Sequence, residues 1–198
     1  MVTHAPTRLL VITDRAQTRR RPLADVVQAA VEGGARAVVL REKDLPADDR
    51  TELASTLAAV LHPVDGILLV ASGPDRGDGV HLAAGDPFPD PAPRIVGRSC
   101  HGDAELQSAA TEGCTYATLS PIFPSASKPG YGPPLGPESL RDAPLPVVAL
   151  GGVTLSNAGA CLAAGAAGAA VMGEIMRAAD PAAAVAALLD ALSTTVTP

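Results

Sequence analysis

Short runs of β-branched and aliphatic residues recur eight times along the 198 residues, and Ala/Leu-rich stretches follow most of them. Each run has the length of one buried strand, and the stretches between them have the length of helices. Parallel strands need a crossover connection, so this alternation favours a parallel sheet with helices outside it. The chain is therefore predicted to be an α/β protein built from repeated strand–helix units.

The pattern also predicts the boundaries of these units. Strands are expected at 8–14, 37–42, 66–72, 79–83, 95–100, 116–121, 146–151 and 168–173. Helices are expected at 22–33, 46–61, 103–112, 136–142, 154–164 and 180–193. Two helices are missing from this series, because only residues 73–78 separate the third and fourth strands and the segment DPFPDPAPR after the fourth holds too many prolines.

Three of the predicted helices end on a glycine that is followed by a buried strand. Gly34, Gly113 and Gly165 fit the left-handed position just beyond a helix terminus. Such a repeated turn is typical of a closed barrel, although an open doubly wound sheet also uses it. We expect one domain over residues 1–198, a small single (β/α)8 TIM barrel in which the third and fourth helices are reduced.

Composition excludes several classes of function. Aromatic residues make up only 2% of the chain, so the core must be built from Ala, Val, Leu and Ile. A net charge of −6 gives no global attraction for nucleic acid or for an anionic membrane. The three cysteines have no metal-type or disulfide-type spacing, and no signal-like or bilayer-length apolar segment occurs. A cytoplasmic location is expected, and the oligomeric state is left open, a homo-oligomer included.

Catalytic residues of a (β/α)8 barrel lie where the strands end, and here those ends are rich in cations. Arg41, Lys43 and Lys128 would bring three positive charges to one mouth of an acidic protein, which suits one or more phosphate groups. The alternative is that Arg41 and Lys43 form surface ion pairs with Glu42 and Asp44.

Backbone groups at the last two strands could also bind phosphate. Gly151 and Gly152 follow the seventh strand, and Met172 and Gly173 end the eighth, where many barrels bind an anion through N–H groups. Tight loop geometry alone is the competing interpretation of the two adjacent glycines. The Pro/Gly/Ser-rich segment 120–136 has the composition of a functional loop, with Ser125 and Ser127 as hydroxyl donors beside Lys128.

Taken together, five segments resemble the thiamine phosphate synthase and TenI family in order and approximate spacing: VLREK (39–43), GVHL with Asp86 following (79–86), GRSCH (97–101), SPIFPSASKPG (120–130) and ALGGV (149–153). The resemblance spans nearly the whole chain. It implies a synthase that joins thiazole phosphate to hydroxymethylpyrimidine pyrophosphate and expels pyrophosphate through a pyrimidine carbocation, with Mg2+ on the pyrophosphate.

The resemblance also implies a role for each matching residue. Pyrophosphate would be held by Arg41, Lys43 and Lys128. Thiazole phosphate would be held by Ser125, Ser127, Gly152 and the backbone at Met172 and Gly173. Ser99 would lie near the reacting pyrimidine, and Asp86 would be a metal ligand.

Several positions depart from the synthase pattern. The Asn-Asp pair after the third strand is Ala71-Ser72, which removes one metal carboxylate. A Gln in the second strand is Val39, and the Gly-Gln before Asp86 is Ala83-Ala84.

These departures leave two other functions open. One is a metal-independent TenI-like thiazole tautomerase, and the other is a catalytically silent protein that binds a phosphorylated ligand. The acid/base His of the TenI branch is Pro121 here, so His101 is the nearest substitute, with a helix-start role as the competing interpretation. His81 alternates with apolar neighbours and is expected to be packed in the structure.

Overall fold

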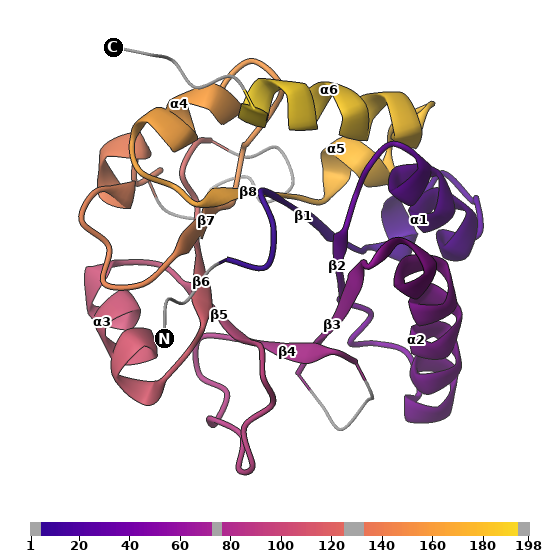
Figure 1. Cartoon of the computed structure of the whole chain (residues 1–198), viewed down its shortest axis with the longest axis horizontal. Helices are drawn as coiled ribbons and strands as arrows, with labels where there is room; N and C mark the ends of the chain where they lie inside the picture. Colours follow the sequence, from indigo (N-terminus) through magenta and orange to yellow (C-terminus); the bar gives the residue numbers. More distant parts are fainter. Residues whose placement is uncertain (1–4, 73–76, 125–132, 194–198) are drawn as a thin grey trace.

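Eight parallel strands close into a barrel in sequence order in a computed structural model, which describes residues 5–72, 77–124 and 133–193 (Figure 1). The strands are β1 Leu9–Ile12, β2 Ala37–Leu40, β3 Ile67–Ala71, β4 Gly79–Leu82, β5 Val96–Cys100, β6 Tyr116–Leu119, β7 Val147–Ala149 and β8 Gly168–Val171. The ring closes because β1 pairs with both β2 and β8, with Val11 opposite Val38 and Leu10 opposite Ala170. The predicted (β/α)8 barrel is confirmed.

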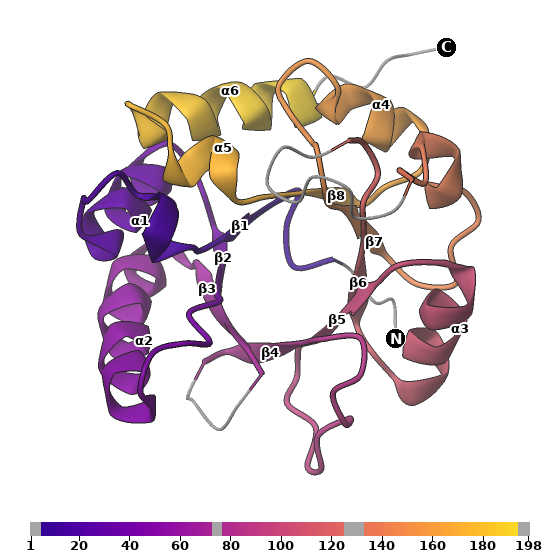
Figure 2. The same ribbon diagram turned by 180° about the vertical axis from the view of Figure 1, so that it is seen from behind.

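The helices form an incomplete outer ring. The α-helices are α1 Leu23–Glu32, α2 Ala47–Leu61, α3 Asp103–Glu112, α4 Ala158–Ala163, α5 Gly173–Met176 and α6 Pro181–Ser193. The described residues also form the 3-10 turns η1 Arg15–Gln17, η2 His62–Val64 and η3 Pro137–Leu140. In the described part of the chain no helix separates β3 from β4 or β4 from β5, and Figures 1 and 2 show a loop without a helix between β4 and β5. None of the described helices is long and apolar enough to cross a membrane.

Some predicted boundaries were wrong. Most strands end earlier than predicted; β1, for example, ends at Ile12, and the Asp14 side chain accepts a hydrogen bond from the Ala16 N–H at the start of η1. The helix expected at 136–142 is the 3-10 turn η3, and the helix expected from 154 begins only at Ala158, since the side chain of Asn157 accepts from the Thr154 N–H. The short helix α5 was not predicted.

Alternating side chains divide the core into two layers. Leu9, Val11, Val38 and Leu40 point outward and pack under the helices, whereas the cluster containing Leu10, Val39, Leu69 and Val148 fills the barrel. Ala5, Ile67 and Ile95 pack against this inner cluster at the N-terminal end of the strands, and Leu150 and Met172 pack against it at the other end. The interior is therefore filled, and a ligand can approach only at the mouths.

The predicted helix-terminal glycines have the expected backbone. Gly34, Gly113 and Gly165 have φ angles of 107°, 95° and 104°. A Cβ in this left-handed region costs roughly 1 kcal/mol, so these glycines let each helix end and the next strand begin within a few residues. The compact αβ turns allow this short chain to close a full barrel.

Candidate phosphate site at the mouth of the barrel

Arg15 binds the two carboxylates that follow β2. Its guanidinium donates to both oxygens of Asp44 at 2.7 Å and to Glu42 at 3.1 Å, and its backbone N–H donates to the other Glu42 oxygen. Glu42 is buried, so this pairing compensates the loss of its hydration. The expected alternative, that Arg41 and Lys43 pair with these carboxylates, is not what the described contacts show.

Arg41 and Lys43 are consequently presented outward from the end of β2. The Arg41 backbone N–H donates to the buried Thr13 hydroxyl at 2.9 Å, which ties this turn to the end of β1. The side chains of Arg41 and Lys43 are both exposed. Two solvent-facing cations two residues apart, with their neighbouring carboxylates already engaged, form a suitable site for a multiply charged anion.

Lys43, Ser72 and Asp86 form a chain of polar contacts across the ends of β2, β3 and β4. The Lys43 ammonium donates to Ser72 Oγ at 3.3 Å, and the Ser72 hydroxyl donates to Asp86 Oδ2. The same carboxylate accepts from the Ala83 N–H at 2.7 Å. These bonds, with the Ser72 hydroxyl first, hold the pKa of Asp86 below its usual value, and the charges of Lys43 and Arg98 lower it further. Asp86 is therefore a preorganised carboxylate beside a cation.

Arg98 anchors the segment that carries Asp86. It is buried on the outer side of β5, and one of its terminal nitrogens donates to the carbonyls of Ala83, Ala84 and Asp86 at 2.8–3.0 Å. The other terminal nitrogen donates to Glu112 at 2.6 Å, at the end of α3. Three carbonyls of a segment without a helix are thus satisfied by one guanidinium. A single arginine connects the loop after β4 to the helix after β5.

Ser99 lies on the inner face of β5 at the same mouth, partly exposed. His81 Nε2 is 3.0 Å from Ser99 Oγ, and His81 Nδ1 is 2.8 Å from the Tyr116 hydroxyl. Burial first, and the charge of Lys43 second, lower the pKa of His81 to about 4, and the charge of Asp86 opposes this shift. His81 is therefore neutral at physiological pH, and the expectation that it is packed in the structure is confirmed.

His101 is exposed at the start of α3. Its backbone N–H donates to Glu105 at 2.7 Å, and its Nδ1 is 2.9 Å from the Ser120 carbonyl oxygen. A carbonyl accepts only, so Nδ1 carries a proton in this contact. These contacts match the helix-start role, and a role for His101 in proton transfer stays a prediction.

The two glycines after β7 pack against the segment after β6. Gly151 and Gly152 have φ angles of 88° and 65°. A Cβ on Gly151 would lie 2.8 Å from Pro121 Cα, and one on Gly152 would lie 2.4 Å from the Pro124 carbonyl oxygen. Close packing of two loops thus requires both glycines, as the alternative interpretation of this pair expected.

Met172 and Gly173 lie at the start of α5, where Met172 packs against the inner cluster. Ser125, Ser127 and Lys128 lie outside the described residues. The structure brings Arg41, Lys43 and Asp86 together around the ends of β2 to β4. Ser99 lies at the end of β5 at the same mouth, in contact with His81 of β4.

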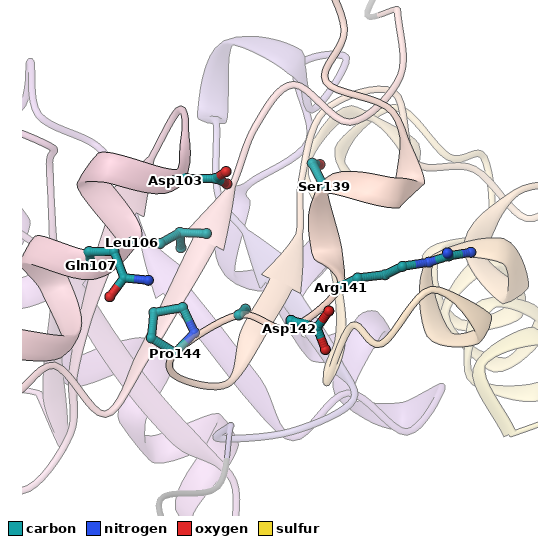
Figure 3. Close-up of a pocket in the computed structure, with 8 residues that line it drawn as sticks. Asp103, Leu106, Gln107, Ser139, Arg141, Asp142 and Pro144 are labelled. Carbon is teal, nitrogen blue, oxygen red and sulfur yellow. The ribbon is translucent and has the colours of Figure 1, made fainter.

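A separate hollow of about 220 Å³ lies on the flank of the barrel, between α3 and η3 (Figure 3). Its lining includes Asp103, Gln107 and Asp142, and Figure 3 shows the Arg141 side chain extending away from Asp103. No predicted site residue lines this hollow, so it is distinct from the mouth.

Three polar residues that hold the site together, Arg98, Tyr116 and Arg15, were not predicted from the sequence. Arg98 was detectable as the charged residue of a predicted strand that is otherwise uncharged, and Tyr116 as the only aromatic side chain at the start of a predicted strand. Arg15 carried no comparable signal, because an arginine after a strand is ordinarily solvated.

Comparisons with known proteins point to one family. The family model described as thiamine monophosphate synthase matches residues 9–175. The thiamine-phosphate synthase of Roseiflexus castenholzii is 38% identical over 195 residues, which cover 91% of this chain and 86% of that protein. A putative thiamine-phosphate synthase of Geobacter sulfurreducens is 38% identical over 189 residues, covering 87% of this chain and 88% of its own.

A solved structure gives the same result. The thiamine phosphate pyrophosphorylase of Pyrococcus furiosus superposes with a TM-score of 0.83 at 30% identity, covering 95% of this chain and 96% of that one. The family match over residues 9–175 spans all eight strands of the barrel.

Proposed function

The chain belongs to the thiamine monophosphate synthase family, and on that premise we propose that it is a transferase that couples thiazole phosphate to hydroxymethylpyrimidine pyrophosphate. Pyrophosphate is the other product. The proposal is supported by relatives named thiamine-phosphate synthase that are similar over most of their length. The expectation of a thiamine-biosynthesis enzyme with this barrel is confirmed at the level of the family.

The pair of cations at the end of β2 is the observation that supports this proposal best. Arg15 occupies the carboxylates of Glu42 and Asp44, so Arg41 and Lys43 are available to a ligand. In the proposed reaction the bond from the pyrimidine methylene carbon to a pyrophosphate oxygen breaks, and negative charge accumulates on the departing group. Fixed cations at that point stabilise the transition state more than the ground state.

The remaining roles are proposals from the family pattern. Lys128 would complete the pyrophosphate site, while Ser125, Ser127, Gly151, Gly152, Met172 and Gly173 would surround the thiazole phosphate. Ser99 would contact the pyrimidine pyrophosphate substrate.

The residues at the mouth fit Mg2+ only when a pyrophosphate is bound there as well. Among the described residues no three or more His, Cys, Asp or Glu side chains form a group that could hold a metal ion by itself. Mg2+ commonly uses one or two carboxylates plus phosphate oxygens and water, so Asp86 and a bound pyrophosphate are a sufficient set. When bound there, Mg2+ would neutralise charge on the pyrophosphate. Asp86 would orient it, and Ser72 would hold Asp86.

We also propose that the protein works in the cytoplasm on small phosphorylated substrates. Cys100, Cys114 and Cys161 are all buried and free, and burial raises the pKa of each thiol. Buried neutral thiols of this kind suit a reducing compartment.

One assay tests the proposed reaction. Purified protein is incubated with thiazole phosphate and hydroxymethylpyrimidine pyrophosphate, with and without Mg2+, and thiamine phosphate and pyrophosphate are quantified. Equal amounts of the two products, dependent on Mg2+, are expected. Absence of both products at saturating substrates and Mg2+ would refute the proposal.

The TenI-like alternative predicts a different outcome in a parallel assay. Ser72 in place of a carboxylate is the observation that favours it, because a tautomerase needs the thiazole phosphate site and no metal. If the protein aromatises a thiazole carboxylate phosphate without metal and does not catalyse the coupling reaction, it is a tautomerase and the synthase proposal is wrong. Binding without either reaction would identify the silent phosphate-binding protein.

A further inference from the structure

The barrel interior contains one line of polar side chains that leads to the mouth. Tyr116, His81 and Thr118 are buried among an inner cluster that is otherwise apolar, and Ser99 ends the line where the barrel opens. Buried polar groups in such a setting are costly unless each finds a partner, so their donors and acceptors are strongly constrained.

Gly97 determines where the Tyr116 ring lies. A Cβ on Gly97 would lie 2.2 Å from the ζ carbon of Tyr116 and 2.4 Å from its hydroxyl oxygen. The absence of a side chain at this position on β5 therefore leaves the space that the ring fills. This placement brings the Tyr116 hydroxyl within 2.8 Å of His81 Nδ1.

The direction of the hydrogen bonds follows from the chemistry of the three groups. Among the described residues His81 Nδ1 is the hydrogen-bond partner of the Tyr116 hydroxyl, and a phenol is a better donor than acceptor toward an imidazole nitrogen. If Tyr116 donates to Nδ1, the single proton of the neutral ring lies on Nε2, which then donates to Ser99 Oγ at 3.0 Å. With the opposite tautomer, the buried phenol hydrogen has no acceptor among the described residues.

We propose that Tyr116 and His81 fix the Ser99 hydroxyl as a hydrogen-bond donor toward the bound substrate. Ser99 Oγ accepts from His81, so its own hydrogen points to a ligand rather than into the barrel. Tyr116 and His81 are positioning residues, and Ser99 is the residue that contacts substrate. This inference rests on the proposed function for the identity of the substrate, but not for the direction of the bonds.

A fixed donor selects the atom it faces. The matching groups on hydroxymethylpyrimidine pyrophosphate are acceptors, either a pyrimidine ring nitrogen or a phosphate oxygen. An exocyclic amine, which is a donor there, is disfavoured at this position. Ser99 Oγ keeps a second lone pair, so it can accept from an amine only when its own hydrogen turns away from the ligand, and the hydrogen bond that it donates there is then lost.

Thr118 is the competing donor to the same imidazole. Its hydroxyl is 3.5 Å from His81 Nε2, at the limit of a hydrogen bond. If Thr118 rather than Tyr116 set the tautomer, Nε2 would be the acceptor and Nδ1 would carry the proton. The two possibilities differ in the tautomer of His81, that is, in which ring nitrogen carries the proton.

Nitrogen NMR of the ¹⁵N-histidine-labelled full chain measures the tautomer of His81, and no substrate is needed. The His81 signal is assigned by its loss in His81→Asn. We expect the Nε2–H tautomer in the parent and in Thr118→Val, and loss of this preference in Tyr116→Phe. An Nδ1–H tautomer in the parent, or an unchanged tautomer in Tyr116→Phe, would overturn the inference whether or not the protein is a synthase.

Binding then tests whether Ser99 donates to a ligand. Calorimetry with Mg2+ compares Ser99→Ala with the parent toward inorganic pyrophosphate and toward hydroxymethylpyrimidine pyrophosphate. A loss of roughly 10- to 100-fold is expected for the second probe, as for a hydrogen bond to a charged or strongly polar group. A matching loss for pyrophosphate identifies a phosphate oxygen as the acceptor, and no such loss identifies the pyrimidine. Unchanged affinity for both probes would overturn the inference.

A double variant separates positioning from a structural role. Tyr116→Phe keeps the ring over Gly97 and should weaken binding of hydroxymethylpyrimidine pyrophosphate by several-fold in the parent but not in Ser99→Ala. Equal losses in both backgrounds, with the same melting temperatures, would show that Tyr116 does not act through Ser99. If these binding results are obtained but the coupling assay gives no product, the proposed reaction is refuted and the inference about Ser99 stands.

Discussion

The hydroxyl of Ser72 donates a hydrogen bond to the carboxylate of Asp86, across the ends of β3 and β4. Ser72 has a φ of 48°, a left-handed conformation that is uncommon for residues with a side chain. The backbone therefore directs this hydroxyl at the one residue that the family pattern assigns to the metal. Lys43 joins this pair by donating a hydrogen bond to Ser72 Oγ.

Removing the hydroxyl should alter stability in a pH-dependent manner. The pKa of Asp86 is lower in the folded protein than the ordinary 3.8, first because of the Ser72 bond. Its stabilisation is thus complete above about pH 4 and is lost as the pH falls through the lowered pKa. Ser72→Ala should unfold at lower urea than the parent at neutral pH, and the gap should close in acid. A gap independent of pH would contradict this account; Asp86→Asn serves as the control that lacks the titrating group.

Adding a carboxylate should strengthen Mg2+ binding. Aspartate tolerates the left-handed backbone of position 72, and Ser72→Asp would place a second carboxylate beside Asp86. With Ala71→Asn in the same chain, half-maximal coupling should need less Mg2+, and calorimetry with Mg2+ and pyrophosphate should show tighter binding. Without metal the two carboxylates repel, so the variant should be less stable unless Mg2+ and pyrophosphate are present. An unchanged Mg2+ requirement in the correctly folded double variant would count against the transferase.

Arg41 and Lys43 should contribute to anion affinity and little to stability. Arg41→Ala and Lys43→Ala should each weaken pyrophosphate binding by roughly 1.5–3 kcal/mol, the range for hydrogen bonds to charged groups. Both side chains are exposed, so melting temperatures without ligand should barely change. Arg94→Ala is a matched control, because Arg94 is exposed before β5 at the opposite end of the barrel. Parent-like affinity in both test variants would show that these cations do not bind the ligand.

Periodicity was sufficient to predict the barrel, because each buried strand of a parallel barrel needs apolar residues and each αβ turn needs a residue such as Gly113. The reduced third and fourth units were predictable from the short segment 73–78 between two predicted strands and from the prolines of DPFPDPAPR after the fourth strand. The cations at the end of β2 could be placed at the mouth, since strand ends determine that position regardless of detailed packing.

Long-range pairing could not be predicted in the same way. Arg15 and Glu42 are 27 residues apart, and nothing local indicates that this arginine takes the carboxylates beside Arg41. The contact of Tyr116 with His81 spans 35 residues and depends on the absence of a side chain at Gly97. Such partners are determined by the register of neighbouring strands, which the sequence pattern specifies only to within a few residues.

Gly151 should be intolerant of a side chain. Its φ is 88°, and a Cβ would lie 2.8 Å from Pro121 Cα, so Gly151→Ala must shift one of two packed loops. A loss of about 1–3 kcal/mol in unfolding free energy is expected, as for overpacking at a strained position. Gly85→Ala is the control, since no atom lies within 4 Å of its Cβ position. Equal effects of the two substitutions in urea unfolding would contradict this prediction.

Arg98 should connect the stability of the β4 loop to the function of Asp86. Arg98→Met keeps much of the buried apolar stem but removes the donors to Ala83, Ala84, Asp86 and Glu112. These partners are partly exposed and can bind water instead, so a loss of about 1–3 kcal/mol in unfolding free energy is expected. Arg98→Lys should recover only part of it, because an ammonium does not reproduce the planar fork.

Mg2+-dependent pyrophosphate binding gives the second readout for Arg98. If the arginine holds Asp86 in place, Arg98→Met should weaken that binding in the parent but not in Asp86→Asn, where the carboxylate is already absent. Calorimetry on the four proteins of this cycle measures the coupling. If Arg98→Met weakens pyrophosphate binding equally in the parent and in Asp86→Asn, Arg98 contributes only to the general stability of the barrel. A loss of binding confined to the parent is expected, because Arg98 binds the carbonyls of a loop that has no helix and so orients the Asp86 carboxylate.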